Sequence, residues 1–315
     1  MTDKKIKIAA IVGPTACGKT SLSVEVAREL GAEIVCCDSM QIYKEMYIGT
    51  ATPTAEEMGG VPHHLFASVE PSVAFSCSDY ASAADEAIKD IASRGKLPIL
   101  VGGTGLYLDS VLLGCGDSSA APDEAFRTEM KKIAEEQGND ALHAILAEKD
   151  PEAAAAIHPN NVKRVIRALE ICNSCGTKTE YDKRARSGMR YDATVVGINY
   201  SDRSVLYDRI NRRIDKMLDE GLVDETKRLL ELGVFETNST AAQAIGYKEI
   251  LPYIRGDEAL SESAERLRIS TRHYAKRQLT WFYAKDYVEW VCADGMENEK
   301  IFKNIVKNII KLFNI

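Results

Sequence analysis

The feature that most constrains this sequence is a glycine-rich loop between a predicted strand and a predicted helix. The apolar run Ile6–Val12 is typical of a buried parallel strand. It is followed at once by Gly13-Pro14-Thr15-Ala16-Cys17-Gly18-Lys19-Thr20, which has the form G-x4-G-K-T. Thr20–Leu30 then carries apolar residues at helical spacing. A phosphate-binding P-loop requires this context, so we predict an α/β fold with a parallel sheet.

The residue types of the loop indicate its chemistry. The backbone N–H groups of Gly13–Thr20 and the helix N-terminus favour phosphate oxygens. Lys19 brings a positive charge to the terminal phosphates. The Thr20 hydroxyl is a candidate ligand for Mg²⁺, which is usually held by few protein groups plus phosphates. A glycine turn without a ligand is the weaker alternative, given the flanking strand and helix.

The rest of the sequence divides into an α/β core and a helical insertion. Further strands are predicted at Ala32–Cys37, Leu97–Val101, Ala193–Tyr200 and Tyr287–Ala293, and further core helices at Ser78–Arg94, Ser204–Glu220, Ser261–Lys285 and the segment around Ile301, Ile305 and Ile309. Asp123–Lys149 and Val162–Ile171 favour helix, and no convincing strand lies between them. We therefore predict a P-loop core of residues 1–115 and 192–315 and a helical insertion at 116–191.

Composition excludes some classes of protein. Eight cysteines in 315 residues do not indicate a disulfide framework, and Cys172-Asn173-Ser174-Cys175 lacks the second pair that a zinc site needs. No apolar run approaches the roughly 20 residues of a membrane span, and no signal peptide is predicted. We therefore expect a cytoplasmic protein without a membrane partner. We also expect a monomer. The net charge of −7 argues mildly against a nucleic-acid partner, but a local basic surface can outweigh the total.

Polar segments follow two other predicted strands. Asp38-Ser39-Met40-Gln41 comes after the second strand, and Gly102-Gly103-Thr104-Gly105 closes the third. Open α/β sheets place their sites at such strand ends. Asp38 is therefore a candidate metal ligand or general base. The adjacent His63 and His64 are assigned positioning roles, because neighbouring residues seldom point at one metal ion.

Eight sequence blocks occur in order across nearly the whole chain: GPTACGKT, DSMQIY, IGTATP, VPHHL, VGGTGLYL, RINRRIDKMLDEGLVDE, AIGYKE and TRHYAKRQLTWF. Together they resemble the bacterial tRNA dimethylallyltransferases of the tRNA isopentenyltransferase family. The resemblance implies a P-loop NTPase-like parallel sheet with a helical insertion. It also implies transfer of a dimethylallyl group from dimethylallyl diphosphate to N6 of adenosine 37 in tRNA, beside the anticodon, with Mg²⁺. Two departures are Cys17 in place of the usual serine and Thr52 where many members carry lysine.

The resemblance also implies roles for single residues. Asp38 would be the base that activates N6. Lys19, Thr20 with its Mg²⁺, and Thr104 would stabilise the leaving diphosphate. Arg209 and Arg213 lie at i and i+4, so one or both would reach the diphosphate, with solvated charges as the alternative. The residues expected at the tRNA are Asp38, Ser39, Met40, Gln41, Thr104, Arg127, Lys163, Arg164, Val165, Ile166, Arg167, Gln243, Ala244, Ile245, Gly246, Tyr247 and Lys248.

A local basic surface is expected despite the acidic total, because RNA backbone binding needs one. Between Asn160 and Arg190 only Glu170, Glu180 and Asp182 oppose the basic residues. The basic residues of this stretch are Lys163, Arg164, Arg167, Lys178, Lys183, Arg184, Arg186 and Arg190. A second cluster, Arg272–Gln278, interleaves charge with Tyr274. Trp281 and Phe282 either support the substrate site or pack in the core.

Three alternatives remain open. A small-molecule kinase using ATP at the P-loop would leave the basic insertion without a role. An adenylate isopentenyltransferase, with a free nucleotide as acceptor, would share the P-loop and Asp38 but would not need the basic insertion. A non-catalytic tRNA-binding protein would have no use for a complete P-loop.

Overall fold

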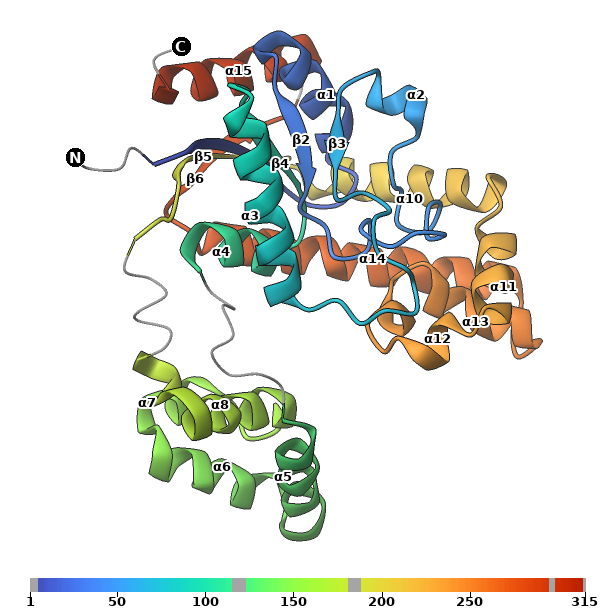
Figure 1. Cartoon of the computed structure of the whole chain (residues 1–315). Helices are drawn as coiled ribbons and strands as arrows, with labels where there is room; N and C mark the ends of the chain where they lie inside the picture. The colour runs from blue at the N-terminus through green and yellow to red at the C-terminus, as the bar shows by residue number, and fades with distance from the viewer. Residues whose placement is uncertain (1–4, 115–122, 181–187, 295–297, 314–315) are drawn as a thin grey trace. The chain divides into compact units, whose positions relative to one another are not determined.

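The computed structural model describes residues 5–114, 123–180, 188–294 and 298–313 (Figure 1). The chain divides into two compact units, one formed by Met1–Val111 and Tyr191–Ile315, the other by Leu112–Arg190. The second unit thus begins four residues before the predicted insertion, at 112 instead of 116, and ends at 190 instead of 191.

A six-stranded parallel sheet forms the centre of the first unit. Its strand order is β3-β2-β4-β1-β5-β6. The strands are β1 (Lys7–Val12), β2 (Glu33–Cys36), β3 (His63–His64), β4 (Pro98–Gly102), β5 (Asp192–Asn199) and β6 (Val288–Cys292). All five pairings are parallel, which confirms the predicted fold class. β3 was not predicted, because a strand of two residues shows no sequence periodicity.

Helices cover both faces of this sheet. α1 (Lys19–Leu30) and α15 (Asn298–Phe313) share one core cluster with the sheet, in which Ile301, Ile305 and Ile309 of α15 are buried. α3 (Cys77–Ser93) lies on the other face. The reason is that the β1-to-β2 and β3-to-β4 crossovers run in opposite directions along the sheet while both keep the right-handed sense.

The remaining helices of the first unit follow or flank the strand ends. They are α2 (Ala55–Met58), α4 (Gly105–Leu113), α10 (Arg203–Asp219), α11 (Leu222–Glu231), α12 (Val234–Thr237), the 3₁₀ helix η1 (Ala241–Gln243), α13 (Tyr247–Arg255) and α14 (Leu260–Tyr283). α10 and α14 are the long ones, and they bring distant sequence segments to the P-loop.

Within its described residues, the second unit has helices and connecting turns as its secondary structure. Its main helices are α5 (Glu124–Gln137), α6 (Asn139–Lys149), α7 (Pro151–Ala156) and α8 (Val162–Cys175). The predicted helical stretch Asp123–Lys149 is divided at Gly138, whose φ of 90° ends α5. Leu142, Leu146, Val165 and Leu169 centre a separate apolar core.

Candidate active site

The P-loop leaves β1 at Val12 and enters α1 at Lys19. Gly13 has a φ of 145°, and a Cβ there would lie 2.5 Å from the Ile198 carbonyl oxygen. Gly18 has a φ of 95° and precedes the helix. Both positions therefore require glycine. The Lys19 ammonium donates to the Gly13 oxygen at 3.0 Å and the Pro14 oxygen at 2.8 Å, so its charge lies over the loop.

Two arginines of α10 reach the same loop. Arg209 Nε donates to the Ala16 oxygen at 2.7 Å, and an Arg213 nitrogen donates to Thr15 Oγ1 at 3.4 Å. Burial lowers the pKa of the Arg213 guanidinium, while the negative charge of Asp38 acts in the opposite direction. The structure thus brings both side chains to the P-loop, whereas the alternative was solvated charges on an isolated helix face.

Asp38 and Thr104 lie at neighbouring strand ends. β2 and β4 run side by side, with Cys36 opposite Val101. A Cβ on Gly102 would lie 1.9 Å from the Cys37 oxygen, so the two chains approach closely only because that residue is glycine. Thr104 Oγ1 accepts a hydrogen bond from the Ser39 N–H at 3.0 Å. The half-buried Asp38 carboxylate accepts one from the Met40 N–H at 3.0 Å.

Two side chains of α14 join this group, and sequence analysis assigned neither to the site. The Gln278 amide accepts from the Thr15 N–H at 2.8 Å and donates to the Gly103 oxygen at 2.9 Å. Burial raises the pKa of the Tyr274 phenol, and the charge of Asp38 acts in the same direction. A buried glutamine inside a basic segment carries no motif, so only the structure identifies it.

A third missed residue is Glu225 of α11. Glu225 is 7% exposed, and its carboxylate accepts from the backbone N–H groups of Tyr47, Ile48 and Gly49 and from the Tyr247 hydroxyl. Gly49 lies against the Tyr247 ring, where a Cβ would come within 2.5 Å. Three of the resembling sequence blocks are therefore joined by one buried carboxylate.

The Gln41 side chain is hydrogen-bonded to the loop that Glu225 holds. Its amide donates to the Thr50 oxygen at 3.1 Å and to the Ala51 oxygen at 2.8 Å. The N–H end of the Gln41 side chain is thus bound to the protein.

The predicted tRNA contacts at residues 243–248 differ in exposure. Gln243 is exposed, and Ile245 and Lys248 are half-buried. Ala244, Gly246 and Tyr247 are buried, so their side-chain positions serve packing.

The predicted contacts in the insertion divide in the same way. Val165 and Ile166 are buried in its core, whereas Lys163 and Arg164 are exposed. Lys183, Arg184 and Arg186 lie outside the described residues.

Arg127 and Arg167 both bind Glu170. Arg127 Nε lies 3.0 Å, and an Arg167 nitrogen 2.5 Å, from the carboxylate of Glu170, which is 3% exposed. Burial disfavours the charged carboxylate, yet hydrogen bonds from the Asp123 N–H and the two arginines hold the pKa of Glu170 below its ordinary value. Both arginines therefore stabilise the insertion.

Sequence analysis predicts a metal ligand at Thr20, with Asp38 as a candidate, and it favours no metal at the histidine pair or the C-x-x-C segment. Among the residues that the structure describes, no group of three His, Cys, Asp or Glu side chains could hold a metal ion. His64 pairs with Glu33 at 2.7 Å, whereas His63 bonds to the Val61 oxygen, so the histidines have different partners. The Thr20 hydroxyl and the Asp38 carboxylate are hard oxygen donors, which fit Mg²⁺ when phosphates and water complete its shell.

Trp281 and Phe282 pack in the protein. Phe282 is fully buried, and a Cβ on Gly105 would lie 2.1 Å from the Trp281 ring. The Trp281 Nε1–H is buried without a hydrogen-bond partner. These contacts favour the core-packing interpretation over a direct substrate contact.

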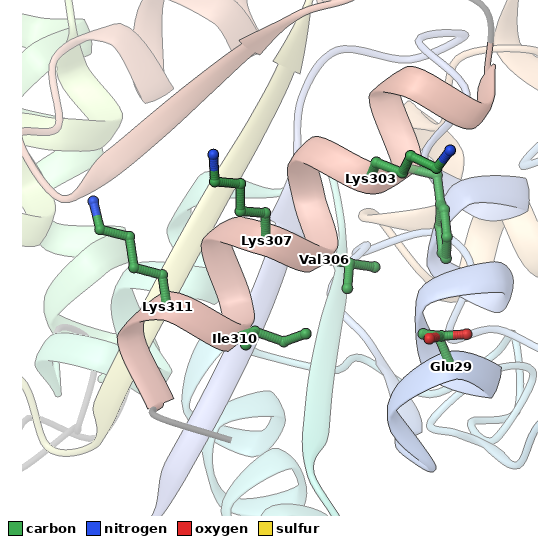
Figure 2. A pocket seen from close by; sticks show the side chains of 7 residues that line it. Glu29, Lys303, Val306, Lys307, Ile310 and Lys311 are labelled. Atoms are coloured by element: carbon green, nitrogen blue, oxygen red, sulfur yellow. The ribbon is translucent and has the colours of Figure 1, made fainter.

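A groove of about 450 Å³ lies between α1 and α15 (Figure 2). Lys303, Lys307 and Lys311 extend along one side of α15, while Val306 and Ile310 turn toward Glu29. Glu29 belongs to the last turn of α1, whereas the P-loop meets the first turn. This groove is therefore separate from the phosphate-binding end of the helix.

The parallel sheet, the strand–P-loop–helix unit and the carboxylate after β2 define a P-loop α/β protein. A family model described as IPP transferase matches residues 41–285, and one described as isopentenyl transferase matches residues 6–73. The chain therefore belongs to the tRNA dimethylallyltransferase (IPP transferase) family. This membership confirms the resemblance drawn from the sequence blocks.

Individual relatives agree with this assignment. The tRNA dimethylallyltransferase of Thermoanaerobacter sp. (strain X514) is 46% identical over 98% of this chain and 99% of the relative. That of Bacillus subtilis (strain 168) is 50% identical over 92% of each.

Two solved structures are also similar. The tRNA isopentenylpyrophosphate transferase of Bacillus halodurans is 44% identical, with a TM-score of 0.72 over 98% of this chain and 99% of the other. A eukaryotic dimethylallyltransferase acting on tRNA is 29% identical, with a TM-score of 0.81 over 98% of this chain and 79% of the other. No helix in the described ranges is long and apolar enough to span a membrane.

Proposed function

We propose that this protein transfers the dimethylallyl group of dimethylallyl diphosphate to N6 of adenosine 37 in tRNA and releases diphosphate. The observation that carries the proposal is a cationic P-loop after β1 and Asp38 after β2, at the same edge of the sheet and separated there only by β4. The family assignment supports both substrates. We also propose a monomeric, cytoplasmic enzyme whose P-loop takes an allylic diphosphate instead of ATP.

The donor half of the reaction requires stabilisation of a leaving diphosphate. Lys19, Arg209 and Arg213 supply three positive charges at the loop. Charge grows on the diphosphate as its bond to the allylic carbon breaks, so these groups bind the transition state more strongly than the substrate.

Mg²⁺ would be held by Thr20 together with the diphosphate oxygens. It would supply further positive charge to the leaving group. The loop residues would orient the diphosphate by their backbone N–H groups and the N-terminus of α1.

The acceptor half requires a base. The adenine N6 lone pair is delocalised into the ring, so attack is favoured when a proton is removed as the new bond forms. Asp38 would accept that proton. Its carboxylate is oriented by the Met40 N–H, and the adjoining Ser39 N–H is fixed by Thr104. The attacked base must leave the anticodon-loop stack to reach such a carboxylate.

The tRNA backbone would meet exposed basic side chains. Lys163 and Arg164 of α8 are exposed. Neither forms an ion pair with another described residue, unlike Arg127 and Arg167. Gln243 offers an exposed amide from the first unit. Such contacts fix register and supply affinity that falls with salt.

The direct test is mass spectrometry of an anticodon stem-loop RNA after incubation with dimethylallyl diphosphate, Mg²⁺ and the protein. The expected product carries one dimethylallyl group on the adenosine beside the anticodon. Parallel reactions with AMP, and with ATP in place of the prenyl donor, separate the alternatives. Prenylated AMP with unmodified RNA, or phosphoryl transfer without prenyl transfer, would refute the proposal.

A further inference from the structure

Gln278 joins the two halves of the site through hydrogen bonds to backbone atoms. It lies on α14 and is 5% exposed. Its amide oxygen accepts from the Thr15 N–H of the P-loop at 2.8 Å, and its amide nitrogen donates to the Gly103 oxygen at 2.9 Å. One buried side chain thus fixes the P-loop to the loop that follows β4.

The same connection continues to Asp38. Thr104, the residue after Gly103, accepts from the Ser39 N–H at 3.0 Å, and its own N–H donates to the Cys37 oxygen at 3.2 Å. These two bonds hold the backbone on either side of Asp38. A continuous set of hydrogen bonds therefore runs from the P-loop through Gln278 and Thr104 to the backbone around Asp38.

A glutamine suits these two partners for a chemical reason. The contacts demand one acceptor and one donor on the same planar group, which an amide offers and a carboxylate does not. The fit is also tight, since a Cβ on Gly103 would lie 2.0 Å from the Gln278 nitrogen. Both ends of the amide are occupied by the protein, so Gln278 acts through the loops it holds.

We propose that Gln278 is a positioning residue that sets the distance between the P-loop and Asp38, and hence between the leaving diphosphate and the base. This inference rests on the proposed function, in which the P-loop binds the diphosphate of the prenyl donor and Asp38 takes a proton from the adenine acceptor. A shift of about 1 Å between reacting groups can lower a rate by about 100-fold. The rate of transfer is therefore expected to depend on Gln278 more than either substrate's affinity does.

The test compares Gln278→Glu and Gln278→Met with the wild type in steady-state prenylation of the stem-loop. The glutamate keeps the shape and the acceptor but loses the donor to Gly103, and the methionine loses both hydrogen bonds. We expect kcat to fall roughly 10- to 100-fold in both variants, with each KM within about threefold. The Kd of inorganic pyrophosphate, measured by calorimetry, should also stay within about threefold, because Lys19 and the arginines remain.

Asn238→Asp is the matched control. Asn238 is also a buried amide between two backbone segments, since it donates to the Pro71 and Val73 oxygens and accepts from the Thr240 and Ala241 N–H groups. The same amide-to-carboxylate change should lower Tm comparably while kcat stays within about twofold.

Several outcomes would overturn the inference. These are a kcat near the wild-type value in folded Gln278→Glu or Gln278→Met, an equal kcat loss in Asn238→Asp, a collapse of pyrophosphate affinity, or failure of both Gln278 variants to fold. Absence of prenyl transfer by the wild-type protein would instead refute the proposed function, a result distinguishable from any effect of the variants.

Discussion

The charged residues around the P-loop differ from those of the insertion in what holds them. Lys19 and Arg209 donate to backbone carbonyls, Arg213 donates to a hydroxyl, and Asp38 accepts from a backbone N–H. In the insertion, Glu170 instead binds two arginines directly. A charge that is hydrogen-bonded only to neutral groups can still attract a charged ligand. The fields of two oppositely charged side chains in an ion pair largely cancel.

This difference separates residues that look alike in sequence. Arg127, Arg167, Arg209 and Arg213 all lie on predicted helices and were all candidate substrate contacts. The two that bind Glu170 are explained by stability, and the two at the P-loop by anion binding. The following changes test whether the partner of a charge decides its role.

Asp38→Ala should have the largest effect on activity. Loss of a general base lowers rates by about 10²–10⁴-fold, and the base acts mainly in the transition state. Single-turnover prenylation should therefore fall by that factor, while filter binding finds tRNA affinity nearly unchanged. Asp38→Asn keeps the shape and should be equally slow. Near-normal turnover in either variant would exclude Asp38 as the base.

Arg213→Ala should have the second-largest effect on activity. Removing one preorganised donor to a developing charge costs about 10²–10³-fold in kcat. Arg167→Ala is the matched control from the insertion and should lower kcat by less than about threefold, because its guanidinium is bound to Glu170. Equal losses of kcat in the two variants would contradict the comparison.

Glu170→Gln should change stability and leave kcat nearly intact. The change leaves two arginines without their shared carboxylate, so the free energy of unfolding should fall by about 1–3 kcal/mol. Urea unfolding followed by circular dichroism measures it. A large loss of kcat with unchanged stability would place Glu170 in the catalytic apparatus.

The effect of Glu170→Gln on the free energy of unfolding should depend on pH. The folded-state pKa of Glu170 lies below its ordinary value, so its stabilisation is present above about pH 4.3 and is lost as the pH falls through the folded-state pKa. The difference in unfolding free energy between wild type and Glu170→Gln should therefore shrink below about pH 4. A constant difference from pH 7 to pH 3 would show that the carboxylate charge contributes nothing.

Lys163→Ala combined with Arg164→Ala should have the smallest effect, a weaker salt dependence of RNA binding. Each lost phosphate contact lowers the slope of log K against log salt by about 0.7–0.9, so the double variant should reduce it by about 1–2. Fluorescence anisotropy of labelled stem-loop at several salt concentrations measures this. Arg167 is left unchanged, since its loss would also weaken the insertion. An unchanged slope would exclude these two residues as backbone contacts.

Some of this architecture was predictable because it depends on local sequence. The run Ile6–Val12, the glycines of the loop and the following helical pattern predicted β1, the P-loop and α1 within one residue. The segment after Leu97 and the apolar stripe of α15 were predictable for the same reason. β3 and the break at Gly138 were not, because two residues show no period and one glycine is tolerated within a helical pattern.

The site shows the same limit. Lys19 and Asp38 were identifiable because each follows a predicted strand that ends at the site. Glu225 and Gln278 were not identifiable, because the hydrogen-bond partners that give each buried polar side chain its role lie far away in the sequence. Val165 and Tyr247 were expected at the tRNA, yet their side chains are buried.

The sequence by itself determined the P-loop, the parallel order of strand and helix, and the family, because spacing and residue type are local properties of the chain. Only the tertiary structure decided which charges are paired and which face the P-loop. Pairing depends on distances between segments such as α10 and the loop, separated by nearly 200 residues. For the same reason, the connection that Gln278 makes between the P-loop and Gly103 exists only in the folded protein.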